Sequence, residues 1–306
     1  MSRFVLRRLA GILLISLAII FFCALGVEMM RRSSGGVNLR DLTSMIGRSA
    51  RQTRTYLDSL LRGDLGFVLR ARGRSRIAVP VTTVLTDTYV KSIGLLLISL
   101  LVAAVLGITA GMIAAYGEGS VISTGVLTTT LLGISLPTFF VALLLQILEI
   151  KWYQRTGMRL VPVGGFGWDA HVVLPALVLA ARPLAQIARV TCVSMSEAAH
   201  EDYVRTAWAK GLPTRQVWGD HVLPNAAVSI LTALGLSLRF SLGSLPVVEY
   251  FFGWPGMGDT LLTAIRMRQT TLLITLALAL GLTFMFVNLL LDVAYRLVDP
   301  RLRTEA

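Results

Sequence analysis

The sequence predicts an all-α polytopic membrane protein with six transmembrane helices, and three observations support that class. Of its 306 residues, 55% are hydrophobic and 15% are charged, whereas soluble domains carry about a quarter charged residues. The mean hydropathy is +0.71. Apolar runs of about 20 residues, long enough to cross the hydrocarbon core, recur along the chain. A soluble globular fold is therefore not expected.

The net charge of +12 does not indicate a nucleic-acid partner. The basic residues form short clusters beside the apolar runs, and Lys and Arg favour such positions at the ends of membrane helices and near anionic headgroups. Cys23 and Cys192 lie in or beside apolar runs without a CxxC spacing. We therefore predict neither a disulfide nor a metal framework.

The first span follows a basic end with Arg3, Arg7 and Arg8 and covers the apolar run 9–30. A signal peptide opens in the same way, but its apolar core is about 7–15 residues long and a small-residue cleavage site follows. Because this run is longer and lacks such a site, we expect residues 1–30 to hold the first transmembrane helix, with a cytoplasmic N-terminus.

Residues 31–90 are predicted to form an external basic loop, with eleven arginines against four aspartates between residues 31 and 89. A basic external loop opposes the positive-inside tendency, but that tendency weakens for loops near or beyond about 60 residues. The alternative is that part of this segment lies along the headgroups as an amphipathic element. The residues leave both interpretations open.

Residues 91–306 are expected to form the core, with five further spans. By composition, spans two to six cover residues 91–115, 121–150, 172–193, 226–248 and 270–298. Pro137 is expected to kink span three. Pro175 and Pro183 are expected to break span four, which also carries Arg182 and Arg189. The aromatic and glycine-rich stretch 152–171 indicates an interfacial loop.

Span three also carries polar residues in an apolar setting. They either face a cavity or bond to neighbouring helices, and they are Thr128, Thr129, Thr130, Ser135 and Gln146.

Six spans with a cytoplasmic N-terminus place the C-terminus and the segment 194–225, between spans four and five, in the cytoplasm. Arg205, Lys210 and Arg215 agree with that side. A miscount of one span would invert the assignment.

The segment 194–225 predicts two short helices joined at an angle. Residues 198–210 are rich in helix formers, Gly211 would end that helix as a left-handed cap, and Pro213 can open a second helix over 215–222 that ends near Leu223 and Pro224. We expect an exposed apolar knob that seats in a partner's groove, formed by Tyr203, Leu212, Val217 and Trp218. The alternative is an amphipathic helix pair lying on the inner leaflet.

No motif for catalysis is present. The sequence has no Gly-x-Ser-x-Gly elbow, no phosphate-binding Gly-x-x-x-x-Gly-Lys-Ser/Thr loop and no His-x-x-x-His pair. Asp292 in span six has no partner aspartate within a span for a protease dyad. We therefore expect no ATP hydrolysis or other catalysis in this chain.

Arg239 is the residue within span five that most needs an explanation. It lies about 21 Å into the helix at about 1.5 Å per residue, and a cation there costs about 2.5–3.5 kcal/mol on insertion scales unless it faces protein or water. One hypothesis is that Arg239 lines a pathway and attracts a substrate carboxylate. The alternative is a structural partner, such as Asp292 or a polar residue of a second subunit.

Several motifs in matching order resemble the permease subunits of ABC transporters, in the dipeptide, oligopeptide and nickel importer group. They are RRL at 7–9, LLRGDLG at 60–66, DYVRTAWAKGL at 202–212, HVLPNA at 221–226, VEYFFGWPGMG at 248–258 and DVAYRLVDPR at 292–301. Peptide permeases usually have a longer external segment after span one. Here the arginine-rich stretch 31–54 stands in its place, which bears on docking of an external binding protein.

The family's coupling motif runs Glu-Ala-Ala, three residues, Gly, nine residues, Ile, one residue, Leu-Pro. Counting back from Gly211 puts the Glu-Ala-Ala slot on residues 205–207 and not on the literal EAA at 197–199. Arg-Thr-Ala in that slot is usual for the peptide group. The resemblance thus implies an ATPase-coupling loop made by Asp202, Tyr203, Arg205, Thr206, Ala207, Lys210, Gly211, Leu223, Pro224 and Asn225.

The resemblance also implies a translocation path for peptides or a related small solute, formed with a second homologous permease. Two cytoplasmic ATPase subunits would bind ATP and Mg²⁺, leaving this chain without a cofactor, and an external solute-binding protein would deliver the cargo. The chain would be a multi-pass protein of the inner or plasma membrane. The implied path and outer gate comprise Arg239, Glu249, Trp254, Pro255 and Gly256. Competing classes are a secondary transporter or channel without an ATPase partner, and a membrane scaffold.

Overall fold

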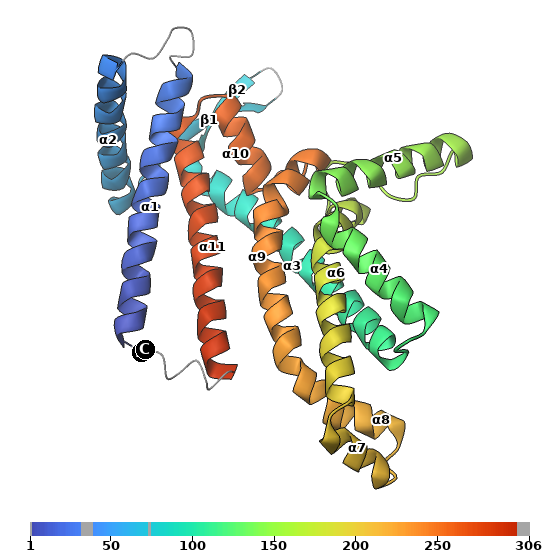
Figure 1. Cartoon of the computed structure of the whole chain (residues 1–306). Helices are drawn as coiled ribbons and strands as arrows, with labels where there is room; N and C mark the ends of the chain where they lie inside the picture. Colours follow the sequence, from blue (N-terminus) through green and yellow to red (C-terminus); the bar gives the residue numbers. More distant parts are fainter. Residues whose placement is uncertain (1, 32–38, 73–74, 299–306) are drawn as a thin grey trace. The chain divides into compact units, whose positions relative to one another are not determined.

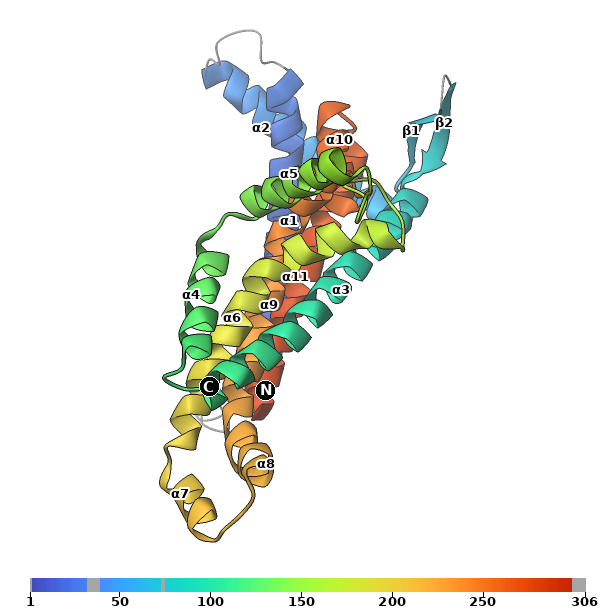
Figure 2. The same cartoon turned by 90° about the vertical axis from the view of Figure 1, so that its right-hand side faces the viewer.

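A computed structural model describes residues 2–31, 39–72 and 75–298, most of which are helical (Figure 1, Figure 2). These residues fall into two compact units. The first contains the described residues up to Ser92 together with residues 255–293. The second contains residues 93–254 and 294–298.

Five helices of the described residues are long and apolar enough to cross a membrane: Ala10–Met30, Val81–Tyr116, Ala170–Ala199, Thr214–Phe252 and Thr270–Val293. A sixth crossing is obtained only if the bent pair Val121–Ser135 and Thr138–Thr156 counts as one span. The all-α membrane class is confirmed, and the count of six spans stays a prediction.

The first unit is built on apolar helices with one hairpin. Its elements are α1 (Ser2–Arg31), α2 (Leu39–Leu61), the antiparallel strands β1 (Phe67–Arg72) and β2 (Ser75–Pro80), the first part of α3 (Val81–Tyr116), α10 (Met257–Arg266) and α11 (Thr270–Val298). Its core joins Ile20 and Ala24 of α1, Val81 of α3, Met257 of α10 and Leu276 of α11.

The stretch predicted as an external loop contains a helix, a hairpin and the first turns of α3, which begins at Val81, ten residues earlier than expected. In α2, Met45 and Tyr56 are buried while Arg51 is exposed, and Arg48 forms an ion pair with Glu28 of α1 at 3.0 Å. The Tyr56 hydroxyl lies 3.0 Å from Thr275 Oγ1 of α11. This packing accounts for the helix, and the external placement of the segment stays a prediction.

The second unit is organised around a packed pair of long helices, α6 (Val173–Ala199) and α9 (Leu223–Phe252), which lie side by side in both views (Figure 1, Figure 2). The rest of α3 packs on α6 so closely that a Cβ on Gly111 would lie 2.5 Å from the Ala188 carbonyl oxygen. The remaining elements are α4 (Val121–Ser135), α5 (Thr138–Thr156), η1 (Ala170–Val172), α7 (Asp202–Ala209), α8 (Thr214–Gln216) and η2 (Val217–Val222).

Pro137 ends a helix and starts another. The helices α4 and α5 meet there at 109°, which is a break sharper than the predicted kink. Leu136 is extended, with φ −76° and ψ 130°, because the ring of a following proline disfavours helical geometry. Pro137 then serves as the N-cap of α5.

The prediction that Pro175 and Pro183 break span four is wrong, because α6 is one continuous helix from Val173 to Ala199. Pro175 lies in the first turn, where a backbone N–H has no intrahelical acceptor to lose. Pro183 lies inside the helix and is buried, so packing on both sides holds the helix together through it.

Candidate functional site: the elbow and the outer aromatic cluster

The first candidate site is the segment 200–225, here called the elbow. In both views α7 and α8 lie at one end of the α6–α9 pair and α5 lies at the other (Figure 1, Figure 2). A single helix was predicted over 198–210, but α6 runs on to Ala199 and the chain turns at His200 and Glu201 before α7 begins at Asp202. The first helix of the elbow, α7, is therefore separate from α6.

Gly211 ends α7 in the predicted left-handed conformation. Its φ is +75°, its N–H donates to the Trp208 carbonyl at 2.9 Å, and the Leu212 N–H donates to the Ala207 carbonyl at 3.4 Å. Only glycine adopts this backbone without a steric penalty. A Cβ at Gly211 would meet no atom within 4 Å, so backbone conformation and not space selects glycine here.

The second helix does not end near Leu223 and Pro224, as had been predicted. It passes from α8 through the π-helical turn η2 directly into α9. The Leu223 N–H donates to the Trp218 carbonyl five residues earlier, and Pro224 lies at the start of α9, where its missing N–H is tolerated. The elbow is thus rigidly continuous with α9.

One face of the elbow is anchored in the unit. Val204, Ala207, Val217 and Val222 are buried in a cluster with Met195 of α6 and residues of α3 and α9. The prediction that Val217 is exposed is wrong, since its exposed fraction is 0%. The sequence does not show that η2 is π-helical. A π-helical turn changes which residues face the core, so the exposure of Val217 could not be predicted from α-helical spacing.

The other face of the elbow is open. Tyr203 and Trp208 are 40% and 44% exposed, while Leu212 and Trp218 are half-buried, and Trp218 packs edge-on against Tyr116 at 5.4 Å. Trp208 was missed as a surface aromatic, although its spacing of three residues from exposed Arg205 and seven from exposed Glu201 indicated the face. Desolvation and the nearby Glu201 carboxylate raise the pKa of Tyr203.

The remaining predicted coupling residues are placed as follows. Arg205 pairs with Asp202 at 3.4 Å on the exposed side. Thr206 Oγ1 donates to the Asp202 carbonyl at 2.9 Å, and Asn225 Nδ2 donates to the His221 carbonyl at 2.6 Å. Lys210 and Pro224 are exposed, and Leu223 is half-buried.

The second candidate site is an aromatic cluster at the opposite end of the unit. Trp254 is fully buried and packs edge-on against Phe166 at 4.8 Å and Trp168 at 5.3 Å. The backbone N–H of Trp254 donates to the backbone carbonyl of Glu249, which is also fully buried. Arg239 lies ten residues before Glu249 on α9, about 15 Å along the helix, so it is not part of this cluster. Pro255 and Gly256 precede α10 in the first unit.

Two residues of α5 hold the loop beside this cluster, Gln146 and Glu149, of which only Gln146 was named from the sequence. Gln146 Nε2 donates to the carbonyls of Val163 and Phe251 at 3.0 and 3.1 Å. The carboxylate of buried Glu149 accepts the Leu160 N–H at 2.9 Å. Gln146 therefore bonds to neighbouring segments, one of the two roles expected for the polar residues of span three.

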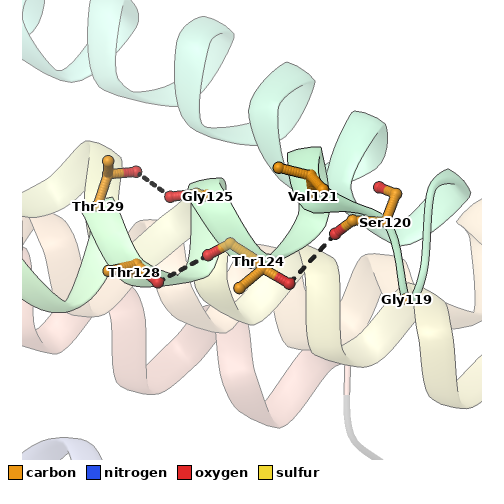
Figure 3. Close-up of a pocket in the computed structure, with 7 residues that line it drawn as sticks. All are labelled: Gly119, Ser120, Val121, Thr124, Gly125, Thr128 and Thr129. Atoms are coloured by element: carbon orange, nitrogen blue, oxygen red, sulfur yellow. Dashed lines mark hydrogen bonds between the residues drawn. The ribbon is translucent and has the colours of Figure 1, made fainter.

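Thr128 and Thr129 of span three line a hollow, one of the two expected roles, and their hydroxyls bond within α4 and not to neighbouring helices. Thr124, Thr128 and Thr129 donate to carbonyls four residues earlier in the same helix, as Figure 3 shows. They line an open hollow of about 460 Å³ on the surface of α4. Threonine hydroxyls in helices commonly donate to the carbonyl four residues earlier in the same helix.

Comparison with known proteins decides the family. Residues 107–304 match the family described as binding-protein-dependent transport system inner membrane component. The chain belongs to this family. It is a membrane-spanning permease subunit of an ABC importer, as the motifs predicted, and it groups with the peptide-type permeases.

Relatives and one solved structure agree. This permease is 35% identical over 272 residues to the di/tripeptide transport system permease protein DppB of Pseudomonas aeruginosa, covering 81% of this chain and 79% of that protein. It is 34% identical over 251 residues to the glutathione transport system permease protein GsiC of Escherichia coli, covering 81% and 78%. Its fold is similar to a crystal structure of an amino acid ABC transporter, with a TM-score of 0.53 and 16% identity over 70% of this chain and 94% of that one.

Proposed function

We propose that this permease forms, with a second homologous permease, the membrane path of an ATP-driven importer for peptides or a related small solute. The elbow is the observation that carries the proposal. It is exposed and continuous with α9, which packs on α6, so an ATPase bound to the elbow can move both helices. The names of the glutathione and di/tripeptide relatives support the cargo class. A secondary transporter or channel works without an ATPase and therefore does not require a docking element such as the elbow.

The proposed motor is a pair of cytoplasmic ATPase subunits, which bind ATP and Mg²⁺, so that this chain needs no cofactor. Their closure displaces the open face around Tyr203, Arg205 and Trp208. Val204 and Val217 are packed into the unit and η2 continues into α9. Because packed interiors transmit displacement with little compression, movement of the elbow shifts α6 and α9 and opens the path to the outside.

The proposed orientation puts the elbow and both termini on the cytoplasmic side. Arg205, Lys210 and Arg215 of the elbow are exposed and support this side by the positive-inside tendency. The aromatic cluster of Phe166, Trp168 and Trp254 then faces the external solute-binding protein and serves as part of the outer gate, with Glu249, Pro255 and Gly256 beside it in the sequence.

Arg239 is proposed to line the path. Asp292, one of the structural partners offered as an alternative for it, forms an ion pair with Arg8 at 2.5 Å. Uptake by Arg239→Ala and Arg239→Lys variants tests the role. We expect the alanine variant to lose uptake and the lysine variant to keep most of it, and unchanged uptake in both would contradict the proposal.

The coupling role is tested by co-purification. Tagged permease is co-expressed with its ATPase subunits, and Gly211→Ala is compared with Gly219→Ala, a second exposed elbow glycine whose φ is not positive and whose added Cβ meets no atom within 4 Å. A left-handed alanine costs about 1–2 kcal/mol, so Gly211→Ala should disfavour this cap geometry and retain less ATPase subunit than the wild type. Gly219→Ala should match the wild type. A wild-type permease that captures no ATPase subunit refutes the proposal.

A further inference from the structure

The apolar stretches of the second unit's spans, which stop short of Glu149, Glu197 and Glu249, carry arginines and no acidic residue. Residues 93–117, 121–148, 173–196 and 223–248 contain no Asp or Glu, whereas 173–196 contains Arg182 and Arg189. Arg182 lies nine residues after Val173, about 14 Å into α6 and about 26 Å from its end at Ala199. A cation at that depth is costly unless it faces protein or water.

Arg182 and Arg189 are seven residues apart and therefore share one face of α6. The other faces are occupied. Ile187 and Thr191 approach Gly107 and Gly111 of α3, and Ala185 approaches Gly133 of α4.

The side of α6 toward α9 is occupied as well, since Val190 packs against a buried cluster that includes Ala233 of α9. What remains is an open strip, here called the cationic face, made by Arg182, Gln186, Arg189 and Val193. Arg189 and Val193 are exposed, and Arg182 and Gln186 are half-buried.

The Arg182 guanidinium is held in place without being neutralised. Its Cζ lies 4.5 Å from the centre of the Phe240 ring of α9, and stacking on a ring fixes the plane of the guanidinium while leaving the positive charge. Its Nε is buried without a hydrogen-bond partner among the described residues. A fixed, planar, charged fork is suited to bidentate binding of a carboxylate.

We propose that the cationic face lines the solute path and binds the carboxylate of the transported solute. Arg182 is the primary contact. Arg189 lies about 10 Å nearer the elbow and binds the carboxylate next as the solute moves toward the cytoplasm. Gln186 lies between them and offers an amide donor. The inference rests on the proposed importer function and narrows it: the cargo is recognised in the membrane by its negative charge, and a peptide supplies that charge at its C-terminus.

The test compares two matched solutes on one complex. The whole transporter, with its second permease, ATPase subunits and binding protein, is reconstituted in proteoliposomes. Uptake of trialanine is measured against uptake of trialanine amide, with each solute at a concentration that loads the binding protein equally. The measured quantity is the ratio of trialanine uptake to trialanine amide uptake. A variant that assembles poorly or couples poorly to the ATPase lowers both uptake rates by the same factor and leaves this ratio unchanged.

In the wild type we expect a ratio well above one. Arg182→Gln should lower it by about tenfold, the loss expected for a charge-assisted hydrogen bond, and Arg182→Lys should restore most of it. Arg189→Gln, whose exposed side chain contributes little packing, should lower the ratio by a smaller factor and serves if Arg182→Gln fails to assemble. Arg159→Gln, at an exposed loop arginine, should leave the ratio unchanged.

A wild-type ratio near one, or a ratio unchanged by Arg182→Gln and Arg189→Gln, overturns the inference. Loss of the second permease from Arg182→Gln with an unchanged ratio makes the cationic face a subunit interface and also overturns it. Failure of the proposed function looks different: the loaded binding protein then stimulates no ATP hydrolysis, and neither peptide enters the vesicles in the wild type.

Discussion

The carboxylate of Glu149 accepts a hydrogen bond from the backbone N–H of Leu160 at 2.9 Å, and this contact ties the end of α5 to the loop that follows it. The same oxygen lies 3.4 Å from the Val161 nitrogen. Glu149 is only 6% exposed, whereas the loop residue Leu160 that donates to it is 63% exposed. Glu149 therefore holds the Leu160 part of the loop next to the aromatic cluster, as Gln146 holds the Val163 part.

Replacing Glu149 with alanine should release this loop. A hydrogen bond to a charged acceptor contributes about 1.5–3 kcal/mol, so Glu149→Ala should lower the melting temperature of the complex and speed tryptic cleavage after Arg159. Gln154→Ala, at an exposed position of the same helix, is the control and should change neither. Equal cleavage rates in wild type and Glu149→Ala would contradict the role of this contact.

Two glycines of the second unit should respond oppositely to alanine. A Cβ on Gly111 would lie 2.5 Å from the Ala188 carbonyl oxygen and 2.6 Å from Thr191 Cβ, whereas a Cβ on Gly125 meets nothing within 4 Å. Gly111→Ala should destabilise the protein by about 1–3 kcal/mol through overpacking, and Gly125→Ala should be neutral or stabilising by up to about 1 kcal/mol. Thermal unfolding in detergent measures both, and equal shifts would refute the close packing of α3 on α6.

The ion pair between Glu28 and Arg48 should hold α2 against α1. Glu28 is buried, but Arg48 is 36% exposed, so the loss on Glu28→Ala should be about 1–3 kcal/mol, below that of a fully buried pair. We expect faster tryptic cleavage at Arg51 and Arg54 in the intact complex. The double variant Glu28→Leu with Arg48→Met should restore resistance, and a double variant as sensitive as Glu28→Ala would argue against the pair.

The Asp169 cap at the start of η1, the short helix that leads into α6, should be lost only in strong acid. Hydrogen bonds from the His171 backbone N–H and then from its ring lower the pKa of Asp169 from its ordinary value of 3.8. Because the folded-state pKa is depressed, the stabilisation is complete above 3.8 and disappears as the pH falls through the lower folded value. Fluorescence of neighbouring Trp168 should lose its acid transition in Asp169→Asn. A cap-dependent change between pH 7 and pH 5 would contradict the assignment.

The sequence was informative where local chemistry decides the structure. Apolar runs gave the membrane helices, and Gly211 was recognised as a left-handed cap because that conformation depends on one residue. The continuity of α6 through Pro183 and the burial of Val217 were not predictable in this way, since both depend on what packs against the helix.

The cationic face was not recognised for a related reason. The spacing of Arg182 and Arg189 is visible in the sequence, but its meaning depends on knowing that α3, α4 and α9 cover the other faces of α6. The Glu149 contact likewise needs the loop folded back on α5. Composition and residue spacing do not determine which distant segments of the chain contact one another.

The central claim, that ATPase subunits dock on the elbow, is tested most directly by site-specific photo-cross-linking in the intact complex. A benzoylphenylalanine is placed at Trp208 of the elbow or at Trp152 of α5, two tryptophans of similar exposure, 44% and 46%, at opposite ends of the second unit. We predict that position 208 cross-links to an ATPase subunit and position 152 does not. Cross-linking to the ATPase from position 152, with none from position 208, would contradict both the docking site and the orientation.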